Sequence, residues 1–243
     1  MIRIGILGIE GRMGRLIADE VNASTFCALA GGLTDRVKTE FKKSEDALVT
    51  TGAEEVIALS DVVIDFTSAE ATAGFARIAA DMGKPFVSGT TGLSAATHDV
   101  LVAMSARIPL LYAANMSLSL TAMKQVTEVA AKLLAAFDYD VAILDEHHRM
   151  KKDAPSGTAI TLGEAVLRGS NGRQQPAFTA VRAGSIIGEH EVVFAGHGET
   201  IRLHHSVTDR RIFARGAVQA ALWLHGKKPG LYGMEDVLGI PTA

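Results

Sequence analysis

Short, continuously apolar segments alternate with amphipathic stretches through the first half of this chain, and this alternation limits the possible folds more than any other feature. Continuous hydrophobicity is typical of strands that are buried on both faces of a parallel sheet. The expected strands are residues 2–7, 27–33, 61–66, 85–88 and 108–112, and the expected helices are residues 12–21, 69–82 and 94–106. Because crossovers between parallel strands are right-handed, the pattern predicts a doubly wound α/β sheet.

The pattern changes after residue 115, where strands begin to follow strands. A long helix is expected over residues 119–137, and its spacing places Ala122, Val126, Val129 and Leu133 on one stripe. The remaining elements are expected as strands at 141–144, 178–182, 191–194 and 200–205 and as helices at 156–167 and 209–224. This order predicts a smaller α+β domain with an open mixed sheet.

Two domains follow from these patterns. We expect residues 1–115 and 216–243 to form a dinucleotide-binding domain, and residues 116–215 to form a domain for substrate binding and oligomerisation. Residues 34–52 are charged and low in apolar content, so we interpret them as a loop that leads to a short helix. The pattern gives no placement for residues 231–240.

Composition excludes several classes of protein. The chain has 24 basic and 27 acidic residues, a net charge of −3, which is unsuited to sequence-independent nucleic-acid binding. Its one cysteine, Cys27, excludes an intramolecular disulfide and a thiolate metal cluster. No apolar run is long enough for a membrane span. We therefore expect a cytoplasmic enzyme or binding protein with no membrane partner.

A glycine-rich turn joins the first expected strand to the first expected helix. Small residues in such a turn let backbone N–H groups approach a pyrophosphate, and the helix N-terminus adds its positive end. The turn therefore predicts a Rossmann-type dinucleotide site, although its spacing is G-x-x-G-x-x-G and Glu10 occupies the middle glycine position. The expected cofactor-binding residues here are Gly8, Ile9, Glu10, Gly11, Arg12 and Met13.

The end of the second expected strand leaves the choice of cofactor open. Asp35 can accept a hydrogen bond from a ribose hydroxyl, which favours NAD. Arg36 or Arg12 can instead bind a 2′-phosphate, which favours NADP. Further along, loops at the carboxyl ends of two strands are placed to contact the nicotinamide half, and Phe66-Thr67 lies at the same edge. These loops contain Gly89, Thr90 and Thr91, and Ala113, Ala114, Asn115 and Met116.

The densest group of reactive side chains lies at residues 145–158, between a strand and a helix. The N–H groups of Gly157 and Thr158 form an anion site at the helix start, and Lys151 adds a point charge. With His147 and His148 upstream, the cluster suits a small carboxylate substrate and a proton donor. No metal is expected, because adjacent histidines on an extended segment point to opposite sides and no cysteine or carboxylate triad accompanies them.

The motifs of the chain, taken together, resemble the 4-hydroxy-tetrahydrodipicolinate reductase family of the diaminopimelate route to lysine. The resemblance runs from residue 2 to about residue 237 and is most specific at Glu146-His147-His148, Lys151 and the run from Asp153 to Ala159. It is carried also by the glycine turn, by Asp65-Phe66-Thr67, Gly89-Thr90-Thr91-Gly92 and Ala113-Ala114-Asn115, and by segments 181–190 and 213–223.

The resemblance implies an activity and a set of roles. The reaction is reduction of the unsaturated dicarboxylated ring by NADH or NADPH, with loss of water, in a homotetramer. His147 is implied as a proton donor or acceptor and Lys151 as the other proton donor, while His148, Gly157 and Thr158 hold the substrate carboxylates. Two positions depart from the family pattern. Glu10 replaces a small residue, and Thr34 takes the place of the acidic ribose-binding residue in one register, with Asp35 in that place in the register one residue on and Arg36 following. The choice between NADH and NADPH stays open between these registers.

Two other functions remain open on the residues alone. One is another dicarboxylate or amino-acid dehydrogenase on the same scaffold. The other is a nucleotide-sensing Rossmann protein without chemistry, which does not need His147 beside Lys151 and binds cofactor without turnover.

Overall fold

A computed structural model describes residues 1–35 and 47–240, and the chain in it forms two compact units. The first unit comprises Met1–Met116 and Arg211–Ala243, and the second comprises Ser117–Arg210. Each unit has its own hydrophobic core.

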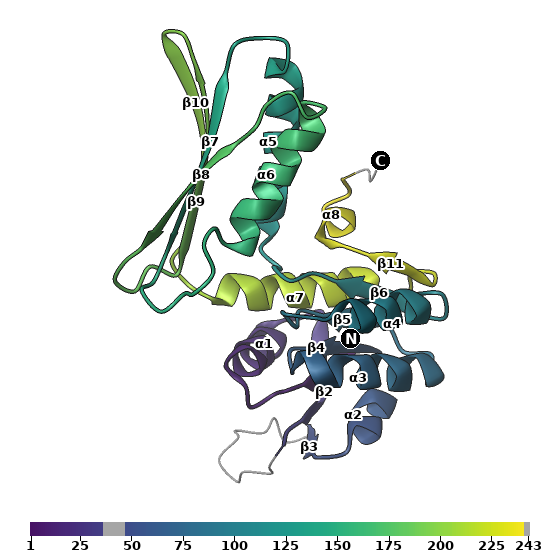
Figure 1. Cartoon of the computed structure of the whole chain (residues 1–243). Coiled ribbons are helices and arrows are strands. Elements are labelled where there is room, and N and C mark those ends of the chain that lie inside the picture. The colour runs from purple at the N-terminus through teal and green to yellow at the C-terminus, as the bar shows by residue number, and fades with distance from the viewer. Residues whose placement is uncertain (36–46, 241–243) are drawn as a thin grey trace. The chain divides into compact units, whose positions relative to one another are not determined.

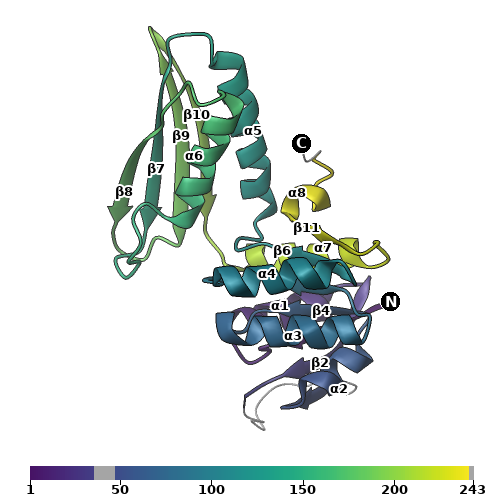
Figure 2. The ribbon, with the colours of Figure 1, turned by 45° about the vertical axis from the view of Figure 1, so that its right-hand side comes forward.

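The first unit contains a seven-stranded parallel sheet with the strand order β11-β6-β5-β4-β1-β2-β3. Helices α2, α3 and α4 lie on one face of this sheet, and α1 and α7 lie on the other (Figures 1 and 2). Its strands are β1 (Ile2–Leu7), β2 (Cys27–Leu33), β3 (Leu48–Thr50), β4 (Val62–Asp65), β5 (Phe86–Ser88), β6 (Pro109–Tyr112) and β11 (Gly230–Tyr232). Its helices are α1 (Arg12–Ala23), α2 (Ala53–Leu59), α3 (Ala69–Asp81), α4 (Ala95–Ser105), α7 (Arg211–Leu224) and α8 (Met234–Val237). The predicted Rossmann-type doubly wound sheet is confirmed.

The central strands have helices on both faces, which explains their uninterrupted hydrophobicity. All four residues of β4 are buried, as are the last four of β1. The limits of β1 and β2 agree with the expected ones, since each strand is bounded by turn residues.

Two short strands differ from the expectation. Residues 48–50 were expected in a loop but form β3, which pairs with Gly31–Leu33 at the edge of the sheet. The segment 231–240, which had no expected placement, contributes β11 beside β6 and the short helix α8. Three-residue strands at a sheet edge are held by main-chain pairing, so their sequences carry little periodic signal.

The second unit is a four-stranded mixed sheet, β10-β9-β7-β8, and helices α5 and α6 cover one of its faces (Figure 1). Strands β7 and β8 are parallel, whereas β9 is antiparallel to both β7 and β10. The elements are α5 (Leu118–Leu134), β7 (Asp140–His147), α6 (Gly157–Gly169), β8 (Ala177–Arg182), β9 (Gly188–Gly196) and β10 (Glu199–Val207). The open mixed sheet predicted for this part of the chain is confirmed.

The apolar stripe expected on α5 faces solvent. Ala122, Val126, Val129 and Leu133 do share one side of the helix, but all four are exposed. The buried side carries other residues, namely Leu120, Thr121, Met123, Thr127 and Ala131. Periodicity identified the helix but not the side that meets the sheet, because alanine- and threonine-rich faces pack closely despite low hydrophobicity.

No helix within residues 1–35 and 47–240 is long and apolar enough to cross a membrane.

Candidate functional site

The glycine turn between β1 and α1 has the geometry that close approach of a phosphate requires. Gly8 has a φ of +84°, which favours glycine. An added Cβ at Gly14 would lie 2.1 Å from the carbonyl oxygen of Gly8, so α1 packs directly on the turn. The N–H groups of Gly8 and Ile9 both donate to the carbonyl of Leu33 at 3.0 Å, which fixes the turn against the end of β2.

A cavity of about 710 Å³ opens beside this turn. Of the expected cofactor-binding residues, Gly8, Glu10, Gly11 and Asp35 line it. The other lining residues are Leu33, Thr34, Thr51, Ala53, Phe66, Thr67, Ser68, Ala71 and Phe75. Arg36, a possible ligand of a 2′-phosphate, lies outside the described residues.

The remaining residues expected around the cofactor do not line this cavity. The side chain of Ile9 is fully buried and its N–H donates to the carbonyl of Leu33, so this residue holds the turn in place. Arg12 is exposed at the start of α1, and Met13 is half-buried beside it. The loops 89–91 and 113–116 follow β5 and β6, at the same edge of the sheet as the glycine turn.

A buried carboxylate, that of Asp65, organises the loops after β4 and β5. Its Oδ2 accepts hydrogen bonds from the hydroxyls of Thr72, Ser88 and Thr90 at 2.8–3.0 Å. Its Oδ1 accepts from the N–H and the hydroxyl of Thr67. The Thr90 hydroxyl also accepts from the Thr67 N–H, and the Thr90 N–H donates to the Ser88 hydroxyl, so the two loops are bonded to each other and to Asp65.

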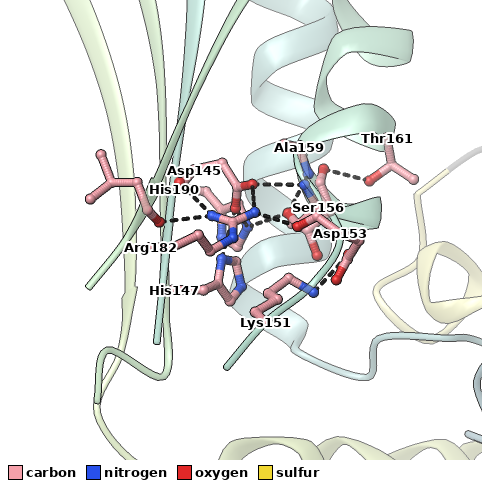
Figure 3. A network of polar contacts seen from close by, with 11 residues as sticks. Asp145, His147, Lys151, Asp153, Ser156, Ala159, Thr161, Arg182 and His190 are labelled. Carbon is pink, nitrogen blue, oxygen red and sulfur yellow. Dashed lines mark hydrogen bonds and ion pairs between the residues drawn. The ribbon is translucent and has the colours of Figure 1, made fainter. Parts of the chain in front are cut away.

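The second candidate site, in the other unit, centres on Asp145 of β7 (Figure 3). Its carboxylate is 1% exposed and accepts hydrogen bonds from the Arg182 guanidinium at 2.8 Å and the Ser156 N–H at 2.7 Å. Burial alone raises the pKa of Asp145, but these bonds, together with the charge of His147, hold the net pKa below its usual value. The group is therefore a buried carboxylate anion at neutral pH.

Two histidine rings surround this anion. The Nδ1 of His147 lies 2.8 Å from Asp145 Oδ1. Burial lowers the pKa of His147, and Lys151 and Arg182 add to this effect against the opposing charge of Asp145. Burial is the main cause that lowers the pKa of His190 to about 4, and the neighbouring His147 adds to this effect. Both rings are accordingly neutral at pH 7.

The loop after β7 supplies the cationic part of the site. The Nζ of Lys151 lies 2.8 Å from Asp153 Oδ2, and Figure 3 shows Lys151 and His147 next to each other at the rim of the network. The Arg182 guanidinium donates hydrogen bonds to the main-chain carbonyls of Asp145 and Asp153, at 3.1 and 2.6 Å. This side chain therefore links the end of β7 to the far end of the loop. His148 follows His147 and is half-buried.

Helix α6 begins where this loop ends. The Ser156 hydroxyl caps the helix by accepting from the N–H of Ala159 at 3.2 Å. Gly157 and Thr158 are the first two helical residues, and N–H groups at these positions have no acceptor within the helix. The start of α6 therefore lies beside the buried network, with the Ser156 hydroxyl 3.2 Å from His190 Nε2.

Asp145, His147 and His190 have ligand atoms close enough together to hold a metal ion. However, the Arg182 guanidinium is bonded to the same carboxylate, and its charge opposes a second cation there. We assign no metal to this cluster.

The sequence identified His147, Lys151 and the α6 N-terminus but assigned no role to Asp145, Arg182, Ser156 or His190. The signal for Arg182 and His190 was their place in segment 181–190, one of the segments that resembled the family. Their contacts with Asp145 span 37 and 45 residues and depend on strand pairing, which the sequence does not disclose.

Comparisons with known proteins cover almost the whole chain. The family model described as "Dihydrodipicolinate reductase, N-terminus" matches residues 2–116, and "Dihydrodipicolinate reductase, C-terminus" matches residues 119–238. The chain is 39% identical to 4-hydroxy-tetrahydrodipicolinate reductase of Thiobacillus denitrificans, across 98% of this chain and 99% of that relative. It is 41% identical to the reductase of that name from Gluconacetobacter diazotrophicus, across 98% of both chains.

A solved structure also resembles this one. It is a dipicolinate-bound dihydrodipicolinate reductase from Paenisporosarcina sp. TG-14, with a TM-score of 0.83 and 21% identity. The match covers 96% of this chain and 97% of that one. At this level of identity the likeness supports the fold.

Proposed function

The chain belongs to the 4-hydroxy-tetrahydrodipicolinate reductase family, and we propose that it performs the family's reaction with His147 and Lys151 as its proton-transferring residues. The protein is an NADH- or NADPH-dependent oxidoreductase of the diaminopimelate route to lysine. It reduces 4-hydroxy-tetrahydrodipicolinate to tetrahydrodipicolinate with loss of water. The family resemblance of the motifs is confirmed.

The glycine turn and its cavity fit a dinucleotide. The positive φ of Gly8 and the packing of α1 on the turn leave no room for a side chain at Gly8 or Gly14, so a phosphate can approach the main chain of the turn. A bound reduced nicotinamide supplies the hydride. We assign the cofactor to Gly8–Met13 and Asp35, with main-chain groups of 89–91 and 113–116 at the same sheet edge.

His147 is proposed as the proton acceptor in the resting site. Because the Asp145 carboxylate can only accept hydrogen bonds, the ring nitrogen that faces it carries the proton. The neutral ring then has a lone pair at Nε2. The anion of Asp145 also stabilises the imidazolium that forms when Nε2 takes up a proton, which allows His147 to return that proton later.

Lys151, His148 and the start of α6 are proposed to bind the two substrate carboxylates. The ammonium of Lys151 and the N–H groups of Gly157 and Thr158 supply positive charge from the loop and from the helix end. Lys151 is held by Asp153, which is exposed, so a substrate carboxylate can compete for the ammonium. The same ammonium is the proposed proton donor.

The observation that carries this assignment is the placement of His147, Lys151 and the α6 N-terminus around one buried network. We propose His147→Gln, Lys151→Ala and, as a matched control on the adjacent exposed lysine, Lys152→Ala. His147→Gln should lower kcat about 100-fold or more, whereas Lys151→Ala should lower kcat and also weaken binding of dipicolinate. The control should change neither quantity by more than about twofold.

Three results would contradict the proposal. Undiminished kcat in both variants would refute the residue roles. Cofactor binding without any substrate-dependent oxidation of NADH or NADPH would refute the activity and favour a nucleotide-sensing protein. Oxidation with a different amino acid or dicarboxylate would favour another dehydrogenase.

We also propose that the protein is a homotetramer in the cytoplasm. No described helix covers the second face of the β7–β10 sheet. On β8 this face carries the exposed apolar side chain of Val181, whereas Phe178 packs on α6 at the covered face. The single cysteine suits a reducing compartment. Light scattering on the purified chain tests the assembly, and a monomer mass would contradict it.

A further inference from the structure

Two departures from the usual dinucleotide-binding pattern, 24 residues apart in sequence, are in contact in the structure. Thr34 is the first residue after β2, where a doubly wound fold usually carries the acid that binds the adenosine ribose. Glu10 lies in the glycine turn, where a small residue is usual. The Thr34 hydroxyl donates a hydrogen bond to Glu10 Oε2 at 2.7 Å. A carboxylate thus lies at the end of β2, but it comes from the glycine turn.

Both partners of this contact are held in place. Thr34 is 5% exposed, and its N–H donates to the carbonyl of Thr50 at 3.0 Å. The guanidinium of Arg15 donates to the main-chain oxygen of Glu10 at 3.0 Å, which fixes the backbone of the turn. A carboxylate has about four lone-pair sites, so the bond from Thr34 leaves capacity for a further donor. The cavity lined by both residues is where that donor arrives.

The charge of the cavity discriminates between the two cofactors. Its charged lining residues, among those that the structure describes, are Glu10 and Asp35, and both are acids. Arg12, the other basic candidate from the sequence, is exposed and does not line the cavity. A ribose 2′-hydroxyl donates to a carboxylate, whereas a 2′-phosphate adds about −1.5 to −2 charges beside it.

We propose that Glu10, oriented by Thr34, binds the adenosine ribose and makes this enzyme prefer NADH to NADPH. The inference rests on the proposed cofactor site and adds the residue that sets its specificity.

Binding affinities test the inference without turnover. Calorimetric titration of the full-length enzyme with NADH and with NADPH should give a dissociation constant about tenfold or more lower for NADH. In Glu10→Gln and Glu10→Gly the two constants should converge to within about threefold. Thr34→Val should weaken NADH binding by about two- to tenfold, because it removes the hydrogen bond that orients the carboxylate. ADP-ribose and its 2′-phosphate should show the same preference, since they lack the nicotinamide.

Two controls separate Glu10 from general charge. Asp19→Asn removes the same charge from an exposed position on α1 and should leave the ratio of affinities unchanged. Asp35→Asn should shift the ratio less than Glu10→Gln does. Equal affinity of the unmodified enzyme for both cofactors, or a ratio that follows Asp35 and ignores Glu10, overturns this inference alone. If neither dinucleotide binds, the proposed function is overturned with it.

Discussion

Replacing Arg182 by Met removes the cation that balances a buried carboxylate. The Arg182 guanidinium donates to Asp145 Oδ2 at 2.8 Å and to the carbonyls of Asp145, Asp153 and Val181. The side chains of Arg182 and Asp145 are 16% and 1% exposed. Loss of one partner from a buried pair costs about 3–5 kcal/mol. Because some water reaches Arg182, we expect the lower end, about 3 kcal/mol, at pH 8.

The loss should depend on pH in a defined direction. In the unmodified protein the pKa of Asp145 is lowered, so its ionisation stabilises the fold above the ordinary pKa of an aspartate and is lost as the pH falls through the lowered value. Without Arg182, burial should raise the pKa of Asp145. The variant then regains part of its free energy of unfolding when that carboxyl takes up a proton. The difference between the two proteins should therefore shrink by about 1 kcal/mol or more between pH 8 and pH 5.

The assay must report on the unit that contains β7. Trp223 belongs to the other unit, so urea unfolding is better followed by a brief deuterium pulse at constant labelling pH and mass spectrometry of β7 and β9 peptides. Arg202→Met is the matched control, because Arg202 pairs with Glu191 at 2.6 Å but is 58% exposed. It should cost less than about 1 kcal/mol. An equal loss at both pH values, or a loss no larger than the control, would refute the reasoning.

Two further predictions concern stability. The pKa of His190, lowered to about 4, lies below the unfolded value of about 6.5, so the unfolded state takes up the proton first and stability falls as the pH drops from about 6.5 to about 4. Unfolding of His190→Asn should lack this part of the pH dependence, and an unchanged slope would contradict the prediction. Gly14→Ala should destabilise the first unit by about 1–3 kcal/mol, because its Cβ would meet the main chain of Gly8 at 2.1 Å. Trp223 fluorescence in urea measures this loss, and Gly74→Ala, with open space around its Cβ, should cause none.

The first sheet was predictable because burial on both faces leaves a strong signal in each strand. The expected and observed limits coincide for β1 and β2, and the glycine turn lies between β1 and α1 as predicted. The edge strand β3 was missed, since three residues held by pairing with Gly31–Leu33 carry no period. On α5 the predicted stripe of Val126, Val129 and Leu133 is exposed, because small residues such as Ala131 make the packed face.

The residues of the candidate sites also differ in how far the sequence predicts them. Residues close in sequence, such as His147 and Lys151, were predicted because their chemical types cluster within one loop. Pairs formed by the fold were not found, whether the pair is Asp145 with Arg182 or Glu10 with Thr34. In the first pair, β7 and β8 are parallel and align His147 with Arg182, a register set by the whole sheet. Sequence analysis can list both members of such a pair but cannot join them.

The hydroxyl side chains at the carboxyl ends of β4 and β5 show why residue type alone predicts too many ligand contacts. Thr67, Thr72, Ser88 and Thr90 suggest a surface made to bind phosphate or ribose oxygens. Instead all four hydroxyls donate to the buried carboxylate of Asp65. A buried anion without donors is costly, so these hydroxyls are required to stabilise Asp65 and are withdrawn from the ligand. It follows that a substitution at Asp65 should disturb the loops after β4 and β5 together, because Thr67 and Thr90 both donate to its carboxylate.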